Sequence, residues 1–271
     1  MPSWPELSKR ERATLVAAIA LVAVLPLLPP IEQDQSYHHF ADTRSWLGIR
    51  NAADVLSNLA FLAAGVVGLA RLPSSRLALP EATRRALWVF FTGLILTGLG
   101  SGWYHLGPGD RSLLWDRMGM TVSFAGVLAA IISQRVSERL ATPMLYVLLA
   151  AGLGSVLYWA ESGSLSAYAL IQFGGMLALL GLLLLAREPR DVLPWGQVLI
   201  WYGLAKIFES GDRLIWSWSN GLFAGHAIKH LAAAGAGFAL AHALTAPKTS
   251  LFRAARHANG STNIPPSRTA E

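Results

Sequence analysis

Residues 87–105 read LWVFFTGLILTGLGSGWYH, and residues 113–132 read LLWDRMGMTVSFAGVLAAII. Each stretch supplies the roughly 20 mostly apolar residues that a helix needs to cross the hydrocarbon core of a membrane. Between them lies Gly107-Pro108-Gly109, a sequence that favours a tight turn. The two stretches therefore predict an antiparallel pair of membrane-spanning helices that are joined on one side of the membrane.

The composition of the whole chain agrees with a membrane protein. Of its 271 residues, 53% are hydrophobic and 14% are charged, and the mean hydropathy is +0.42. Soluble domains carry about 25% charged residues, and disorder needs low hydrophobicity and high charge, so both classes are disfavoured for most of the chain. The chain has no cysteine, which excludes disulfides, thiolate metal ligands and cysteine nucleophiles. The formal charge of +6 comes with no nucleic-acid-binding motif, so we expect no nucleic-acid partner.

Six further apolar stretches have a similar length. We therefore predict an all-α integral membrane protein with eight spans and no room for a separate soluble domain. The expected spans are residues 13–30, 54–70, 87–105, 113–132, 143–160, 166–186, 194–209 and 223–246.

The first of these spans has a second interpretation. It follows Lys9, Arg10 and Arg12, as the hydrophobic part of a cleaved signal peptide would. No convincing small-x-small cleavage site follows it, so we favour an uncleaved transmembrane helix.

The loop charges predict the orientation. Most of the 22 Lys and Arg residues fall on the face that holds both termini and residues 71–86, 133–142 and 187–193. Cytoplasmic loops are enriched in Lys and Arg, so both termini should be cytoplasmic. An even number of spans agrees with this, because it places both termini on the same side. The opposite loops carry only Arg44, Arg50, Arg111 and Arg213.

Five polar side chains are expected at one depth, near the non-cytoplasmic ends of three spans. Ser101 and His105 are four residues apart at the end of 87–105 and share one helix face. Asp116 lies near the start of the next span, and His226 and His230 share a face at the start of the last. Ionisable groups inside a membrane are costly, so each is a candidate functional residue.

Three neutral imidazoles with one open coordination position are typical of a catalytic zinc site. Zinc lowers the pKa of a bound water to about 7 and polarises a carbonyl oxygen. Asp116 could accept the proton of that water or orient a ligand histidine, and Ser101 could donate a hydrogen bond to a developing oxyanion. The alternatives are structural: histidines that bond between helices, a serine that packs, and an aspartate that stabilises a helix start.

These motifs resemble the alkaline ceramidase family, within a wider group of seven-helix membrane hydrolases that includes adiponectin-receptor-like and Per1-like proteins. The resemblance rests on Gly-Ser101-x-x-Tyr104-His105, Asp116, His226-x-x-x-His230 and the pair Ser57-Asn58, and it covers roughly residues 40–246. It implies a seven-helix ceramidase-like core with zinc on the three histidines. Asp116 would then activate the zinc water and Ser101 would help to stabilise the tetrahedral intermediate.

The resemblance also implies a domain organisation. Residues 1–35 would form a basic segment and one extra transmembrane helix, 36–246 the hydrolase core, and 247–271 a flexible cytoplasmic tail. Animal members carry a calcium site built from acidic residues before the first core helix. Here that region offers only Asp42, Asn51 and Asp54, so a calcium site is not a firm expectation.

The stretch from Ala205 to Arg213 looks closer to bacterial members of the family. It contains Glu209 and Asp212, which with Asp42 should lie on the active-site face. We expect these acids to form a solvated loop network with nearby arginines, in preference to a direct catalytic role; the arginines are Arg44, Arg50 and Arg213.

The resulting prediction is a zinc-dependent amidohydrolase that cleaves the N-acyl bond of ceramide or a similar membrane lipid. It would lie in a bacterial inner membrane with its active site near the periplasmic face, and it needs no obligatory protein partner. Three alternatives stay open: a hydrolase of another lipid amide or ester, a receptor-like lipid-binding protein that does not catalyse, and a haem carrier with histidine axial ligands.

Overall fold

The computed structural model describes residues 6–185 and 192–245, and every regular element within these ranges is helical. The last residues of the sixth and eighth expected spans, and the predicted tail at 247–271, lie outside the described residues. The helices in chain order are α1 (Lys9–Val24), η1 (Leu25–Leu27), η2 (Gln35–His38), α2 (Ala52–Ser57), α3 (Leu59–Arg71), α4 (Glu81–Leu106), α5 (Asp110–Arg135), α6 (Glu138–Ser162), α7 (Ser166–Ala169), η3 (Leu170–Gly174, a π-helical turn), α8 (Gly175–Leu185), α9 (Trp195–Ser210), α10 (Asp212–Trp218) and α11 (Gly225–Ala243).

The all-helical prediction is confirmed for the described residues, and five of the expected spans are long and apolar enough to cross a membrane. They are Ala52–Arg71, Glu81–Leu106, Asp110–Arg135, Glu138–Ser162 and Ser166–Leu184. The other three expected spans coincide with α1, α9 and α11. The first two contain only 16 residues each, and α11 begins with two histidines and a lysine. That these three helices also cross the membrane remains a prediction.

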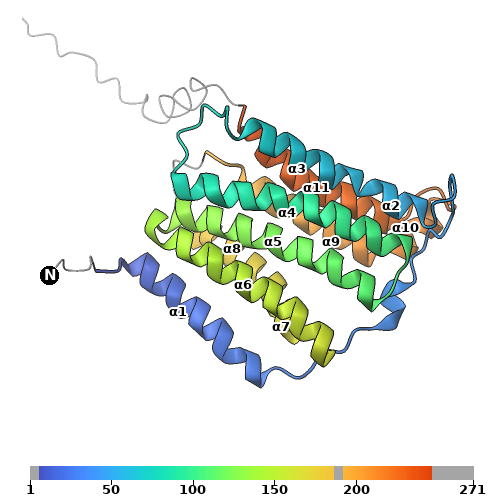
Figure 1. Cartoon of the computed structure of the whole chain (residues 1–271), viewed down its shortest axis with the longest axis horizontal. Coiled ribbons are helices and arrows are strands. Elements are labelled where there is room, and N and C mark those ends of the chain that lie inside the picture. The colour runs from blue at the N-terminus through green and yellow to red at the C-terminus, as the bar shows by residue number, and fades with distance from the viewer. Residues whose placement is uncertain (1–5, 186–191, 246–271) are drawn as a thin grey trace, which may run out of the picture.

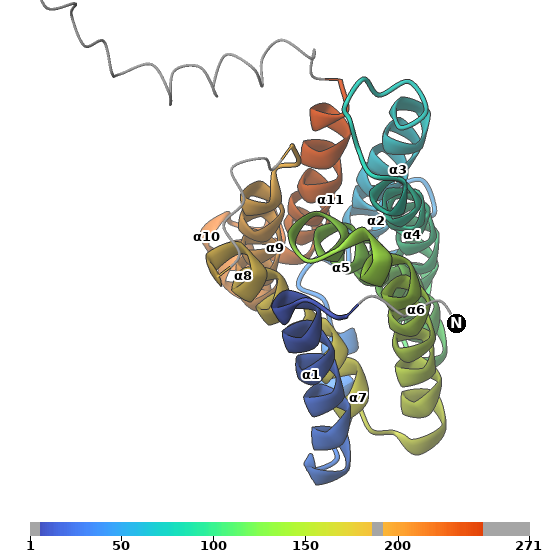
Figure 2. The same ribbon diagram turned by 90° about the vertical axis from the view of Figure 1, so that its left-hand side faces the viewer.

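The helices lie roughly side by side as one bundle, with α4 and α5 in its middle (Figure 1). Helix α5 packs against α4 and α6, while α11 packs against α3 and α9. Figure 2 shows α1 beside α7, at the edge of the bundle away from α3. The short helix α10, which the sequence did not predict, lies near the end of the bundle where the turn joins α4 to α5 (Figure 1).

A glycine sets the close approach of α4 and α5 beside the predicted site. A Cβ atom on Gly100 would lie 2.3 Å from the carbonyl oxygen of Trp115 and 3.0 Å from the backbone nitrogen of Asp116. Real Cβ atoms do not approach backbone atoms this closely, so the helices can meet here only because residue 100 has no side chain. This contact brings Ser101 on α4 against Asp116 on α5.

Helix α1 is joined to the rest of the bundle by polar contacts at both ends. Ser8 caps its first turn in a capping box with Glu11. Glu11 is buried and pairs with Arg139 of α6 at 2.8 Å. Just beyond its other end, the Ser166 hydroxyl donates to the carbonyl of Pro29 at 2.6 Å. The extra helix expected before the core is therefore part of the folded structure.

Candidate metal centre

Three histidines from two helices meet inside the bundle. His105 comes from the last turn of α4, and His226 and His230 come from the first two turns of α11. Their ring centroids are 4.9–5.0 Å apart in every pair. One ligand atom from each ring lies within 4.8 Å of the other two, so a common point lies within about 2.8 Å of all three. Movements of under about 1 Å would bring these atoms to the usual zinc–nitrogen distance of about 2.0–2.1 Å.

His105 supplies the clearest sign that the cluster is built to hold a metal. Its side chain is fully buried, and neither of its ring nitrogens has a hydrogen-bond partner. Leaving a buried polar atom without a partner costs about 1–3 kcal/mol, and such atoms are rare in native structures. A metal ion would give one of these nitrogens a partner, so the residues present fit a bound cation.

The hydroxyl of Ser57 selects the ring nitrogen that His230 can offer. Ser57 Oγ donates its single proton to the carbonyl of Asp54 at 3.0 Å and lies 2.7 Å from Nδ1 of His230. With its proton on the Asp54 carbonyl, the hydroxyl accepts one from Nδ1, which leaves the lone pair on Nε2. Metal-ligating histidines commonly donate their other N–H to such a partner, because the bond fixes both tautomer and ring orientation. The Ser57-Asn58 pair noted in the sequence thus includes a direct partner of a candidate ligand histidine.

The start of α11 is held in place by Asp212. One carboxylate oxygen accepts the backbone N–H of His226 at 2.8 Å, and the other accepts that of Ala41 at 3.0 Å. A carboxylate at a helix N-terminus satisfies an amide without an intrahelical partner and interacts favourably with the helix dipole. A Cβ on Gly225 would lie 2.3 Å from the Phe208 carbonyl oxygen, so glycine allows α11 to begin this close to α9.

Ser101 and Asp116 lie together on the wall of a cavity that His230 also lines. Both side chains are buried. The five residues predicted from the sequence are thus brought to one end of the bundle. His105 and His226 do not line this cavity, so His230 is the histidine that links the cluster to it.

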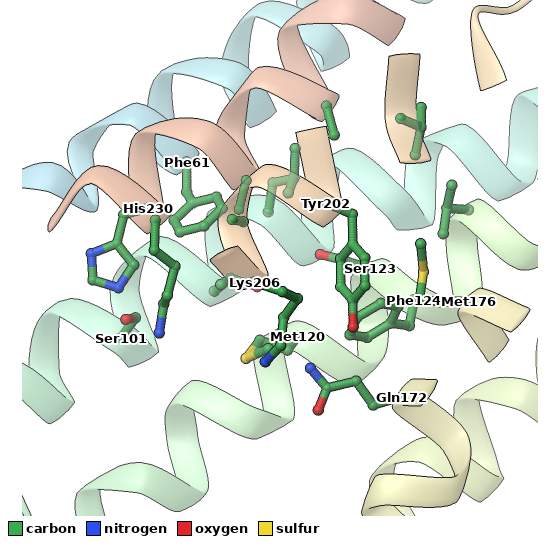
Figure 3. Close-up of a pocket in the computed structure, with 18 of the residues that line it drawn as sticks. Phe61, Ser101, Met120, Ser123, Phe124, Gln172, Met176, Tyr202, Lys206 and His230 are labelled. Carbon is green, nitrogen blue, oxygen red and sulfur yellow. The ribbon is translucent and has the colours of Figure 1, made fainter. Parts of the chain in front are cut away.

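The cavity continues from this polar end into the apolar interior of the bundle. Its volume is about 130 Å³. In Figure 3, His230 and Ser101 lie at one end, Lys206 projects into the middle, and Tyr202 and Met176 lie toward the other end. Along α4 the lining runs from Ser101 back to Phe90, which is about 16 Å at the helical rise of about 1.5 Å per residue. The deeper lining is mostly apolar or aromatic and includes Leu94, Phe124, Val127, Val198 and Ala236; Ser123 and Gln172 are its polar members.

The expected loop network of acids and arginines is only partly correct. Asp42 pairs with Arg44 at 2.7 Å, as predicted. Asp212 instead accepts backbone N–H groups, and Arg50 donates to the carbonyl of Leu106. Glu209 is not in this network at all, because its carboxylate is bound by lysines inside the bundle.

These lysines are Lys206 and Lys229, and sequence reasoning missed their part in the site. Glu209 accepts a hydrogen bond from each of them, and from Lys229 the distance is 3.0 Å. Lys229 Nζ also lies 3.0 Å from Nε2 of His226. The signal was present in the sequence, since both lysines fall inside expected spans and Lys229 stands between the two histidines of α11.

Among the described residues, acidic side chains form no group of three or more that is close enough to share an ion. The three histidines are the one group of three or more His, Asp or Glu residues there that is close enough to share an ion. Asp54, which the sequence offered toward calcium, is fully buried and neither of its carboxylate oxygens has a hydrogen-bond partner. Asn51 instead donates its amide to the carbonyl of His105.

Comparison of the sequence with protein-family models gave no match, and comparison with curated proteins gave none either.

Proposed function

We propose that this protein is an integral-membrane, zinc-dependent hydrolase that cleaves the N-acyl bond of ceramide or a similar lipid. The observation that supports it most directly is His105, whose two buried nitrogens have no partner while two further imidazoles lie 4.9–5.0 Å away. A set of three neutral histidines without cysteine is one of the ligand sets of catalytic zinc. The resemblance to alkaline ceramidases points to the same ligands.

Each polar residue of the cavity has a place in this proposal. Zinc, when bound, would supply Lewis acidity that polarises a carbonyl and makes water a better nucleophile. Asp116 would accept the proton of the attacking water, and Ser101, which lines the same cavity, would donate a hydrogen bond to the developing oxyanion. The Ser57 hydroxyl would keep the ring of His230 in the ligating tautomer.

A lipid substrate is supported by the cavity and by the location of the site. The apolar lining from Phe90 to Leu94 on α4, and from Phe124 to Val127 on α5, can receive an acyl chain. The scissile bond would then lie at the polar end, beside Ser101 and Asp116. Helices long and apolar enough to cross a membrane, among them α4 and α5, line part of this cavity, so a lipid could reach it without entering water. From the loop charges we place this end on the periplasmic side of a bacterial inner membrane.

The test is to purify the protein and its His105→Ala and His226→Ala variants in detergent and to measure metal content by elemental analysis. We expect one zinc per wild-type chain, and at least tenfold less in each variant. Wild-type protein should release fatty acid from ceramide or a related N-acyl lipid, and the variants should not. Zinc at one equivalent in both variants would refute the assigned ligands.

A panel of lipids separates the proposed reaction from its alternatives. Release of fatty acid from phospholipid esters but not from amides would replace the amidohydrolase with a lipid esterase. Bound zinc without turnover of any lipid would favour a receptor-like protein. A Soret band in the absorption spectrum, with no zinc, would favour a haem carrier.

A further inference from the structure

The cavity has a second polar feature that the proposed hydrolysis does not use. Lys206 and Lys229 both line it, and the carboxylate of Glu209 lies between their ammonium groups. Tyr37 donates a hydrogen bond to the same carboxylate at 3.2 Å. The side chain of Lys206 is 34% exposed and that of Lys229 is 16% exposed. Charged groups inside a membrane protein are expensive, so a cluster of three needs an explanation.

The two lysines have more hydrogen-bond donors than the protein uses. An ammonium group carries three N–H donors and no acceptor. Lys206 donates to Glu209, and its Nζ lies 5.5 Å from the ring centroid of Phe173. Lys229 donates to Glu209 and faces Nε2 of His226. Each lysine therefore keeps at least one donor for a molecule in the cavity.

The formal charges of the cavity lining are balanced. The lining carries two ammonium groups, on Lys206 and Lys229, and two carboxylates, on Glu209 and Asp116. A bound anion would therefore be held by the lysine N–H donors that Glu209 does not use, through charge-assisted hydrogen bonds, and not by a net positive charge.

We propose that Lys206 and Lys229 make the cavity selective for acyl lipids whose polar end is anionic. This inference rests on the proposed function, within which the preferred substrate is an N-acyl amino acid, with a carboxylate close to the scissile amide, in place of neutral ceramide. The acyl chain would occupy the apolar part between Phe90 and Met176, while the carboxylate accepts the spare lysine donors. Glu209 holds the two ammonium groups beside each other and limits their attraction for anions.

N-oleoylglycine and N-oleoylethanolamide provide a matched pair of probes, since they share the acyl chain and the amide and differ in a carboxylate against a hydroxyl. Their equilibrium binding would be measured on the full chain in lipid nanodiscs after treatment with a chelator, so that neither metal nor turnover contributes. We expect N-oleoylglycine to bind at least about tenfold more tightly, as a charge-assisted hydrogen bond to a partly buried lysine implies.

Three variants test the residues. Lys206→Gln should bring the two affinities to within about threefold, and Lys206→Arg should keep the preference for the carboxylate. Glu209→Gln should strengthen binding of N-oleoylglycine and leave N-oleoylethanolamide unchanged. Thermal unfolding of each variant checks that it is folded, and the Lys206→Arg variant keeps the test decisive if Glu209→Gln does not fold.

Equal affinities for the two lipids in the wild-type protein, or a preference that survives Lys206→Gln, would overturn the inference. Hydrolysis by the zinc-loaded protein is a separate measurement. If neither lipid is hydrolysed but the carboxylate preference and its loss in Lys206→Gln remain, the hydrolase proposal fails and the anion site stands. If both lipids are hydrolysed with equal efficiency and bound with equal affinity, the hydrolase proposal stands and the anion site fails.

Discussion

The hydroxyl of Ser57 on α2 lies 2.7 Å from Nδ1 of His230 on α11, and it donates its own proton to the carbonyl of Asp54. These two contacts determine which nitrogen of His230 carries a proton. They link α2 to α11, across 173 positions of the sequence. This candidate ligand histidine is therefore oriented by a side chain from a different part of the chain.

Replacing Ser57 with alanine should weaken zinc binding by about 10- to 100-fold, which is the usual effect of removing a partner that orients a metal ligand. Competition with a chelator of known affinity measures this change. Ser162→Ala is a matched control, because Ser162 is exposed and makes only local hydrogen bonds, to the carbonyl of Tyr158 and from the backbone N–H of Ser164. Equal zinc affinity in Ser57→Ala and Ser162→Ala would contradict the role given to Ser57.

Replacing Asp116 with asparagine should lower kcat by about 10²- to 10⁴-fold, the range expected for loss of a general base. Zinc content should stay at the wild-type level, because Asp116 is not one of the three ligands. Steady-state kinetics and elemental analysis on the same preparation test both statements. The exposed residue Glu161 provides the control variant Glu161→Gln, which should keep wild-type activity.

Removal of zinc should lower the melting temperature of the wild-type protein, since a ligand that binds only the folded state stabilises it. At a free zinc concentration of about 100 times Kd, the stabilisation is about 2.7 kcal/mol. Thermal unfolding with and without a chelator measures this loss, and added zinc should reverse it. The His105→Ala variant should show no response to either treatment; a full response would mean that the chelator acts elsewhere.

Replacing Gly225 with alanine should destabilise the protein by about 1–3 kcal/mol, the usual cost of forcing extra atoms into a packed site. The new Cβ would lie 2.3 Å from the Phe208 carbonyl oxygen, so α11 would have to move away from α9. Zinc affinity should fall as well, because His226 follows directly. Gly154→Ala is the control, since nothing lies within 4 Å of a Cβ at that helical position. Gly225→Ala should therefore unfold at a lower temperature and bind zinc more weakly than Gly154→Ala. Thermal unfolding and zinc titration measure the two differences.

The Asp42–Arg44 pair should stabilise the protein near neutral pH, and this stabilisation should be lost in acid. Burial disfavours the charged form of Asp42, but hydrogen bonds from the side chain and backbone of Arg44 outweigh this and hold the pKa of Asp42 below its ordinary value of 3.8. Asp42 therefore contributes stability above its ordinary pKa, and this contribution is lost as the pH falls through the lowered pKa. The melting temperature should drop more between pH 6 and about pH 3 in the wild type than in Asp42→Asn. Parallel curves would contradict this account.

The helices and the depth of the site residues could be predicted from the sequence. The apolar stretches 87–105 and 113–132 became α4 and α5, with boundaries that moved outward by a few residues. The i, i+4 spacing of His226 and His230 placed both on one helix face. These features follow from local rules, because residues per turn and hydrophobic length do not depend on distant parts of the chain.

Other parts of the site depended on which helices become neighbours. Glu209 was expected in a loop with arginines, but α9 packs against α11 and brings it to Lys229 instead. The role of Ser57 depends in the same way on the contact between α2 and α11.

The sequence alone determined that this is a helical chain suited to a membrane, with three histidines, a serine and an aspartate at one depth. The tertiary structure alone decided that the three rings lie within reach of one ion, that Ser57 orients one of them, and that two lysines line the cavity beside them. The physical reason is that hydropathy and helical period are properties of neighbouring residues. The partners of a buried side chain are set by helices that are far apart in the chain.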